Sequence, residues 1–459
     1  MKSAIYEKVR VKPVFGVLIH SSNNEGPCRF GSKKELAPKM DEIRGRENFD
    51  RFCENVRKNL NEDAEILNPV KIKYGDDWII KEEEFKKIDS DKEDVDLYLV
   101  EGAGHLNFAC VKIGERYKKP VALIGDTFGV ANLRAEGLEG YALMNYQELN
   151  YLISLLKIRK SLKKTKILRV LDREIIPGVI NTRKELEYIK KRFGIEYIDI
   201  PIKKLAEKID GVNPKRAEEV VNNLVKNAKK LHMKKEYIIP SVNFYLGVKE
   251  LMREYECNAF TIDCYEICPD GRVASERKAV PCLAHSLLKD EGIPSSCEGD
   301  IGALLSMAIL MYTSKKSIYM GNLNLTKTKN IVRFGHNVPG LKMKGFDKPN
   351  LPYIIKNFTK GGWGATIHYD FSLDKGEEVI LARFNPLADK VLMIKGKIVG
   401  CDGFNKVGCQ LVALVKVKNS EEVFHKSSDF GRHFSMVYGN YVKEVSELGK
   451  IIGFEVVEI

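Results

Sequence analysis

Near the start of the chain stands the apolar run Lys12-Pro13-Val14-Phe15-Gly16-Val17-Leu18-Ile19-His20. The run is short, rich in β-branched residues and free of a helical period, which is typical of a buried strand. Similar runs lie at residues 96–100 and 120–126, and helical patterns at 82–88 and 107–117 separate them. Strands that alternate with helices predict a parallel sheet covered on both faces. We therefore expect the chain to begin with a doubly wound α/β domain.

A second alternating series follows the basic segment Lys163-Lys164-Thr165-Lys166. Its elements are a strand at residues 167–171, a helix at 183–193, a strand at 196–200 and an amphipathic helix at 214–231. The same alternation predicts a second α/β domain of similar size. We place the first domain over residues 1–165 and the second over 166–330.

After about residue 330 the helical period gives way to short alternating runs punctuated by glycine. These runs lie at residues 361–369, 378–384, 391–399 and 410–417, and a helical pattern near 441–452 follows them. Strands at such close spacing predict an antiparallel sandwich or barrel. The expected fold class is therefore α/β, with two doubly wound parallel-sheet domains followed by a mostly antiparallel β domain over residues 331–459.

The length and composition of the chain agree with several domains. A chain of 459 residues exceeds one hydrophobic core, because such cores stop growing at roughly 250–300 residues. The net charge of +12 is spread over Lys-Glu mixtures, which indicates a solvated surface rather than a nucleic-acid site. No apolar run reaches the roughly 18–20 residues of a membrane span, and the N-terminus lacks a signal-peptide pattern. We expect a cytoplasmic protein that binds neither nucleic acid nor membranes.

Five of the ten cysteines crowd one part of the chain. They are Cys257, Cys264, Cys268, Cys282 and Cys297. Because no Cys-x-x-Cys pair occurs, buried reduced thiols are favoured over a zinc or iron–sulfur site, which stays open as an alternative.

Two candidate ligand-contacting segments lie at predicted strand ends. Gly102-Ala103-Gly104-His105 is a glycine turn between a strand and a helix, where backbone N–H groups suit anions or hydroxylated ligands. The third glycine of a dinucleotide fingerprint is absent, so a structural turn and a substrate-contacting turn remain the alternatives. Glu266 follows the strand pattern at 259–262, where open α/β sheets bind ligands, although a solvated loop explains it equally well.

The strongest local feature is the acidic run Cys297-Glu298-Gly299-Asp300 before the apolar helix pattern at 301–312. Helix capping accounts for one acid but not for Glu298 and Asp300 together. His336 and His433 each lie near glycine, where the backbone can approach a site closely. A structural role is common for a single histidine, but Glu298 with both histidines would form an N/O site suited to Mn²⁺.

The order of these features resembles the L-fucose and L-arabinose isomerase family. The resemblance rests on two α/β domains before a β domain, and on Cys297-Glu298-Gly299-Asp300, Gly335-His336 and Gly431-Arg432-His433 in that order. It is specific only from about Ala259 onward. It implies an enzyme that interconverts an aldose and a ketose by moving a proton between C1 and C2 through an ene-diol, with Mn²⁺ or another divalent metal as cofactor.

Residue by residue, the resemblance implies a role for each candidate. Glu298 resembles the first carboxylate ligand and a base, and His336 and His433 resemble the histidine ligands. Asn322 stands where the family has its second carboxylate. An amide oxygen can coordinate a metal but cannot serve as a base at neutral pH. Three alternatives follow: the site binds metal more weakly, it uses Asp300 or Glu266 as the second acid, or it has lost the isomerase reaction.

Family members assemble as trimers or hexamers, so the resemblance also implies a homo-oligomer. In it, the turn with Gly104 and His105 would help to close a neighbour's site around the sugar. A competing hypothesis, motivated by Asn322, keeps the fold as a sugar-binding or regulatory protein without turnover.

Overall fold

The computed structural model describes residues 3–21, 38–103, 107–127, 129–172, 183–264, 267 and 273–459. The chain divides into two compact units, one of residues Glu7–Lys157 and one of Met1–Tyr6 with Ile158–Ile459. In the described ranges, no helix combines the length and apolarity needed to cross a membrane. The expected domain boundaries near residues 165 and 330 stay predictions.

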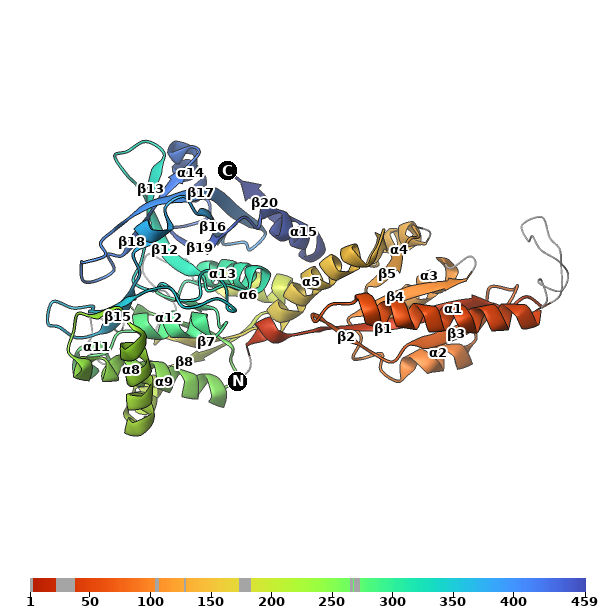
Figure 1. The fold of residues 1–459 in the computed structure, drawn as a ribbon, viewed down its shortest axis with the longest axis horizontal. Helices are drawn as coiled ribbons and strands as arrows, with labels where there is room; N and C mark the ends of the chain where they lie inside the picture. Colours follow the sequence, from red (N-terminus) through yellow and green to blue (C-terminus); the bar gives the residue numbers. More distant parts are fainter. Residues whose placement is uncertain are drawn as a thin grey trace. The chain divides into compact units, whose positions relative to one another are not determined.

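The unit Glu7–Lys157 is built on a parallel sheet (Figure 1). Its strands are β1 (Val9–Leu18), β2 (Ala64–Ile66), β3 (Val70–Tyr74), β4 (Leu97–Ala103), β5 (Val121–Ile124) and β6 (Gly140–Leu143). They lie in the order β2-β1-β4-β5-β6, β3 also pairs with β1, and every pairing is parallel. The helices are α1 (Pro38–Asn59), α2 (Glu82–Asp89), α3 (Asn107–Tyr117), α4 (Val130–Ala135) and the start of α5 (Tyr146–Lys163). The run that begins at Lys12 thus lies mostly in β1, as its apolar pattern predicts.

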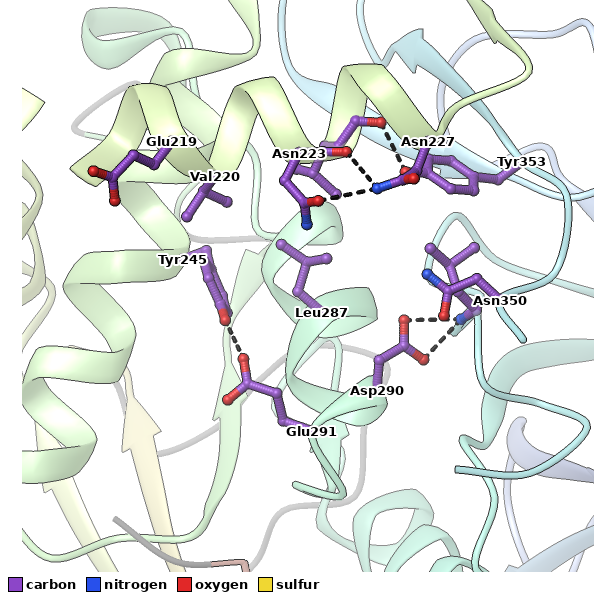
Figure 2. Close-up of a pocket in the computed structure, with 12 residues that line it drawn as sticks. Glu219, Val220, Asn223, Asn227, Tyr245, Leu287, Asp290, Glu291, Asn350 and Tyr353 are labelled. Carbon is purple, nitrogen blue, oxygen red and sulfur yellow. Dashed lines mark hydrogen bonds between the residues drawn. The ribbon is translucent and has the colours of Figure 1, made fainter. Parts of the chain in front are cut away.

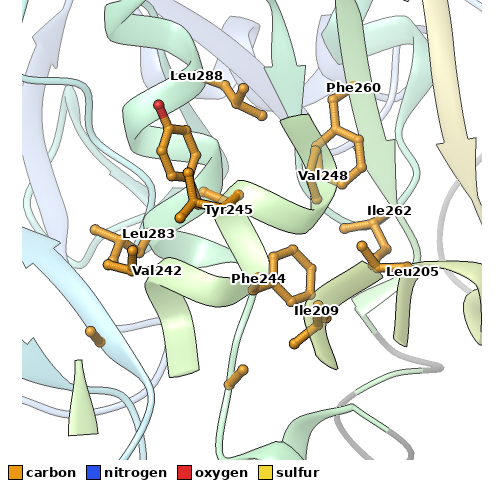
Figure 3. Close-up of a cluster of buried hydrophobic side chains, with 14 of the residues drawn as sticks. Leu205, Ile209, Val242, Phe244, Tyr245, Val248, Phe260, Ile262, Leu283 and Leu288 are labelled. Atoms are coloured by element: carbon orange, nitrogen blue, oxygen red, sulfur yellow. The ribbon is translucent and has the colours of Figure 1, made fainter. Parts of the chain in front are cut away.

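A second parallel sheet lies in the other unit. Its strands β7 (Lys166–Val170), β8 (Glu196–Ile200), β10 (Ala259–Ile262) and β11 (Ser295–Ser296) lie in the order β11-β10-β7-β8. The helices around it include α6 (Arg183–Phe193), α7 (Ile202–Asp210), α8 (Pro214–Asn227), α9 (Ile239–Glu254) and α12 (Cys282–Asp290). Side chains of α7, α9, α12 and β10 meet in one apolar core (Figure 3). Phe244 and Phe260 in this core are 0% exposed, which agrees with a sheet covered by helices.

The predicted helix over 214–231 is shorter in the structure. Helix α8 ends at Asn227 because Ala228 is extended, and Lys230–Leu231 forms strand β9 instead. β9 pairs with β14 (Ile354–Asn357), which also pairs with β15 (Ala365–His368). A pairing partner more than a hundred positions away therefore overrides the local helical pattern.

The C-terminal part forms an antiparallel barrel (Figure 1). Its strands are β12 (Tyr319–Leu325), β13 (Ile331–Gly335), β16 (Glu378–Phe384), β17 (Lys390–Asp402), β18 (Val412–Val417) and β19 (His433–Tyr438). They lie in the order β16-β19-β12-β13-β18-β17, and β17 closes the ring by pairing with β16. β20 (Glu455–Glu458) adds to β17 in parallel, and α14 (Ser420–Ser427) and α15 (Val442–Ile452) complete this part. The predicted fold class is confirmed.

Helix α13 (Ile301–Ser314) joins the second sheet to the barrel. Every residue from Ile301 to Tyr312 is buried, and the helix packs against β11, β16 and β19. A helix that is apolar all round must be covered on all sides. The loop before α13 therefore lies at the junction of the sheet and the barrel.

Candidate metal centre

The acidic loop between β11 and α13 is a tight turn with unusual backbone angles. Glu298 has φ of 57° and Gly299 has φ of 65°. A left-handed backbone is uncommon for glutamate and costs of order 1–3 kcal/mol, so surrounding contacts must hold it. Here the Gly299 N–H donates to the Ile262 carbonyl at 2.9 Å, which ties the turn to the end of β10.

The turn presents Glu298 to two histidines of the barrel. Oε1 of Glu298 lies 3.0 Å from Nε2 of His336, and Oε2 lies 3.2 Å from Nε2 of His433. His336 follows β13 and His433 begins β19, which places both on the barrel. Within the described ranges, these three residues are the one group of three whose ligand atoms lie within 4.8 Å of one another. All three are buried, with exposures of 8%, 0% and 3%.

The charges in this group support one another. Burial alone would raise the pKa of Glu298, but the hydrogen bonds and charges of the two histidines lower it well below its usual range. Burial alone would lower the pKa of His336, but Cys409 and Glu298 raise it to about 9. The pKa of His433 is also raised, since Asp300 and Glu298 outweigh its burial. Protons on the histidines therefore supply the positive charge next to the carboxylate that a bound metal ion would supply.

Asp300 lies behind His433, and both of its oxygens are engaged. Oδ1 accepts from the Ala303 N–H at 2.8 Å and so caps α13. Oδ2 lies 2.9 Å from Nδ1 of His433, and Nη1 of Arg383 lies 2.9 Å from the same oxygen. Although burial opposes it, the Arg383 and His433 charges lower the pKa of Asp300 to about 2. A carboxylate on the far nitrogen fixes the ring of a metal-ligating histidine in this way.

The donor set of the two histidines fits a metal. When the His433 ring is neutral and its Nδ1 donates to Asp300, its buried Nε2 carries a lone pair that faces Oε2 of Glu298 at 3.2 Å. Two histidine nitrogens and one carboxylate are ligands that a borderline divalent ion accepts. Glu298, His336 and His433 could therefore hold a metal ion.

Arg383 is a residue that the sequence reasoning missed. It is 2% exposed on β16 and donates to the carbonyls of Phe430 and His433, the latter at 2.7 Å. Gly431 makes room for it, since a Cβ there would lie 2.6 Å from Nε of Arg383 and the backbone φ is 111°. A lone cation within the apolar strand pattern at 378–384 is the signal that could have identified it.

Asn322 lies beside the metal group. The register of the barrel pairs it with His433 on β19 and with Gly335 on β13. Directly paired residues project on the same face of a sheet, so the Asn322 amide shares the face of His433. Three further expected site residues, Glu266, Gly104 and His105, lie outside the described residues.

A separate pocket of about 420 Å³ lies between α8, α9, α12 and the segment around Leu341 (Figure 2). Two of the three acids that line it, Glu219 being the third, are engaged: Glu291 accepts from Lys249 at 2.6 Å, and Asp290 accepts from the Leu341 N–H at 2.7 Å. Asp290 thus holds a loop in place. The pocket does not share a residue with the metal group.

A buried Glu-His-His group at the junction of an α/β sheet and a β barrel defines a candidate metal-dependent centre. No family model matches the chain. The sulfoquinovose isomerases of Priestia aryabhattai and of Priestia megaterium (strain ATCC 12872 / QMB1551) are each 24% identical to it over 315 residues. That match covers 66% of this chain and 66% of each relative's length.

A third relative, the sulfoquinovose isomerase of Alkalicoccus urumqiensis, is 26% identical over 220 residues, or 47% of each chain. The chain is therefore a distant relative of sugar isomerases, the class that the sequence resemblance indicated. All three relatives are named as sulfoquinovose isomerases, and none is named as an L-fucose or L-arabinose isomerase.

Proposed function

We propose that this protein is a metal-dependent isomerase that interconverts an aldose and a ketose. The observation that carries the proposal is the buried group of Glu298, His336 and His433. The distant sequence similarity to sulfoquinovose isomerases also supports the isomerase proposal. We assign Mn²⁺ or another divalent ion to the three residues, with the Asn322 amide oxygen as a fourth ligand.

A divalent ion bound there would stabilise negative charge on the two adjacent sugar oxygens during proton transfer between C1 and C2. The chain's own groups do the remaining work. Glu298 is 8% exposed and ionised, with both oxygens facing the histidines, so it is placed to hold the metal, and we also assign it the base role that the sequence resemblance implies. Asp300 has both oxygens engaged, so we assign it to positioning His433 rather than to the proton transfer expected from the sequence.

The test follows hydrogen at C2. Purified protein is incubated in deuterated water with Mn²⁺ and a panel of aldoses that includes sulfoquinovose, a pentose and a deoxyhexose. We expect deuterium at C2 and a matching ketose for at least one sugar, and neither after chelation of the metal. If no aldose of the panel exchanges with Mn²⁺ present, the isomerase proposal is wrong.

A second candidate function is sugar binding without turnover, which Asn322 favours because an amide cannot act as a base. Calorimetry separates the two candidates. Binding of a sugar without C2 exchange, and without a metal requirement, would support the binding protein.

We further propose a cytoplasmic homo-trimer or homo-hexamer, with Glu266, Gly104 and His105 contacting the sugar. Light scattering of the purified chain measures the assembly. A monomer at micromolar concentration would contradict this part of the proposal.

A further inference from the structure

The thiols of Cys264 and Cys297 lie beside the metal group and have no part in the proposed reaction. Their Sγ atoms are 3.2 Å apart. Cys264 follows the end of β10, Cys297 follows β11, and these two strands pair in parallel, which brings the thiols together. Since a disulfide bond is about 2.0 Å long, an approach of about 1 Å would join the two sulfurs.

The two thiols differ in access to solvent. Cys264 is partly exposed, whereas Cys297 is 1% exposed. A dissolved oxidant therefore reaches Cys264 first, and the buried Cys297 thiol lies within 3.2 Å of it. An accessible thiol backed by a second thiol is the usual arrangement of a reversible redox site.

We propose that Cys264 and Cys297 form a reversible oxidation site that weakens metal binding. Hydrogen peroxide oxidises the Cys264 thiol to a sulfenic acid and is reduced to water. The Cys297 sulfur then attacks the Cys264 sulfur, the S–S bond forms and the S–O bond breaks. The hydroxide leaves with the Cys297 thiol proton as a second water. Over both steps the two thiols lose two electrons and two protons to the peroxide.

The bond would act on the metal through Glu298, the residue after Cys297. The turn is held by the Gly299 bond to Ile262 at 2.9 Å and by the left-handed Glu298 backbone, with φ of 57°. A shift of about 1 Å in Cys297 displaces the Glu298 carboxylate, and a misplacement of this size is enough to impair the function of a site. We expect Mn²⁺ to bind about 10–100-fold more weakly to the oxidised protein, as when the support of a metal ligand is lost. This consequence rests on the proposed metal group, whereas the oxidation itself does not.

The experiment treats the metal-free full chain with hydrogen peroxide, removes the oxidant and measures three quantities. Intact mass reports the loss of two hydrogens, peptide mapping reports which cysteines are joined, and calorimetry reports Mn²⁺ affinity before and after reduction with dithiothreitol. We expect one bond between Cys264 and Cys297, and an affinity that falls on oxidation and returns on reduction.

Two variants sharpen the result. Cys264→Ser should bind Mn²⁺ like the wild type and lose its sensitivity to peroxide. Cys401→Ser removes another partly exposed thiol, on β17, and should stay sensitive to peroxide.

No disulfide bond, or a bond between other cysteines, overturns the proposed oxidation site. A Cys264–Cys297 bond with unchanged Mn²⁺ affinity overturns the control of metal binding. Because mass and mapping do not depend on turnover, they test the site even if no sugar is isomerised.

Discussion

Glu298 carries a negative charge in a place where burial alone would remove it. Two histidines on the barrel keep it ionised, and its charge in turn keeps protons on them. Glu298 and His336 are therefore both charged at neutral pH before any metal arrives. A metal ion has to displace histidine protons, which makes its affinity depend on pH.

The first prediction concerns that pH dependence. The pKa of His336 is about 9 in the folded protein, above its ordinary value of 6.5. Its charge therefore stabilises the metal-free fold fully below about pH 6.5, and this stabilisation is lost as the pH rises through about 9.

Metal binding has the opposite pH dependence, because a histidine must be neutral to bind the ion. Mn²⁺ affinity should rise about tenfold per pH unit for each displaced proton up to about pH 9. Calorimetric titration from pH 6 to pH 9 measures it, and an affinity independent of pH would contradict the prediction.

The second prediction concerns Asn322. Its register beside His433 places an amide where a carboxylate would add charge to the metal group. Asn322→Asp should tighten Mn²⁺ binding by about tenfold or more and raise isomerase turnover, because a charged oxygen binds a hard cation more strongly. Asn324→Asp, two residues along the same strand and exposed, serves as the control and should change neither. Equal affinities for wild type and Asn322→Asp would remove Asn322 from the metal group.

At the scale of elements, helix α13 and strand β16 hold the two halves of the centre together. Asp300 caps the helix, and Arg383 on the strand bonds that same carboxylate at 2.9 Å and the His433 carbonyl at 2.7 Å. Both partners of the ion pair have side chains 2% exposed. The pair therefore sets the spacing between the Glu298 turn and the barrel histidines.

The third prediction is the cost of breaking this pair. Arg383→Met leaves Asp300 buried without its cation and should lower the free energy of unfolding by about 3–5 kcal/mol. The matched control is Arg333→Met, because Arg333 pairs with Asp402 on the same barrel with about a third of each side chain exposed. That change should cost about 1 kcal/mol or less. Denaturant unfolding measures both, and equal losses would contradict the special role of Arg383.

The elements were largely predictable from sequence because their signals are local. The helix at 183–193 and the strand at 196–200 match α6 and β8 residue for residue, since each has its own periodic pattern. Arg383 and Asp300 are 83 positions apart, and no local pattern links them. The end of α8 also depended on a distant partner, β14. Contacts between segments far apart in the chain could therefore not be predicted from local sequence patterns.

At the scale of the whole molecule, the metal group belongs to one of the two compact units. Glu298, His336 and His433 all lie in the unit with residues Ile158–Ile459. The resemblance predicted these three residues together, and the barrel brings them within reach of one ion. The position of Glu266 and of the turn at Gly104 stays a prediction.

The fourth prediction uses this division. A ligand that binds only the folded state stabilises it by about 2.7 kcal/mol at a concentration 100 times its Kd. Mn²⁺ should therefore raise the unfolding temperature of the unit with residues Ile158–Ile459 and leave that of Glu7–Lys157 unchanged. Scanning calorimetry with and without a chelator measures this, with Glu298→Gln as the control that should not respond. A shift of both transitions, or a full response of Glu298→Gln, would contradict it.

The central claim is that one divalent ion binds between Glu298, His336 and His433. Anomalous X-ray scattering at the manganese edge, from a crystal of the full chain grown with Mn²⁺, tests it most directly. We predict one strong peak within coordination distance of the Glu298 carboxylate and of a ring nitrogen of each histidine, and its absence in Glu298→Gln. A peak held by other residues, or no peak at a saturating Mn²⁺ concentration, would contradict the claim.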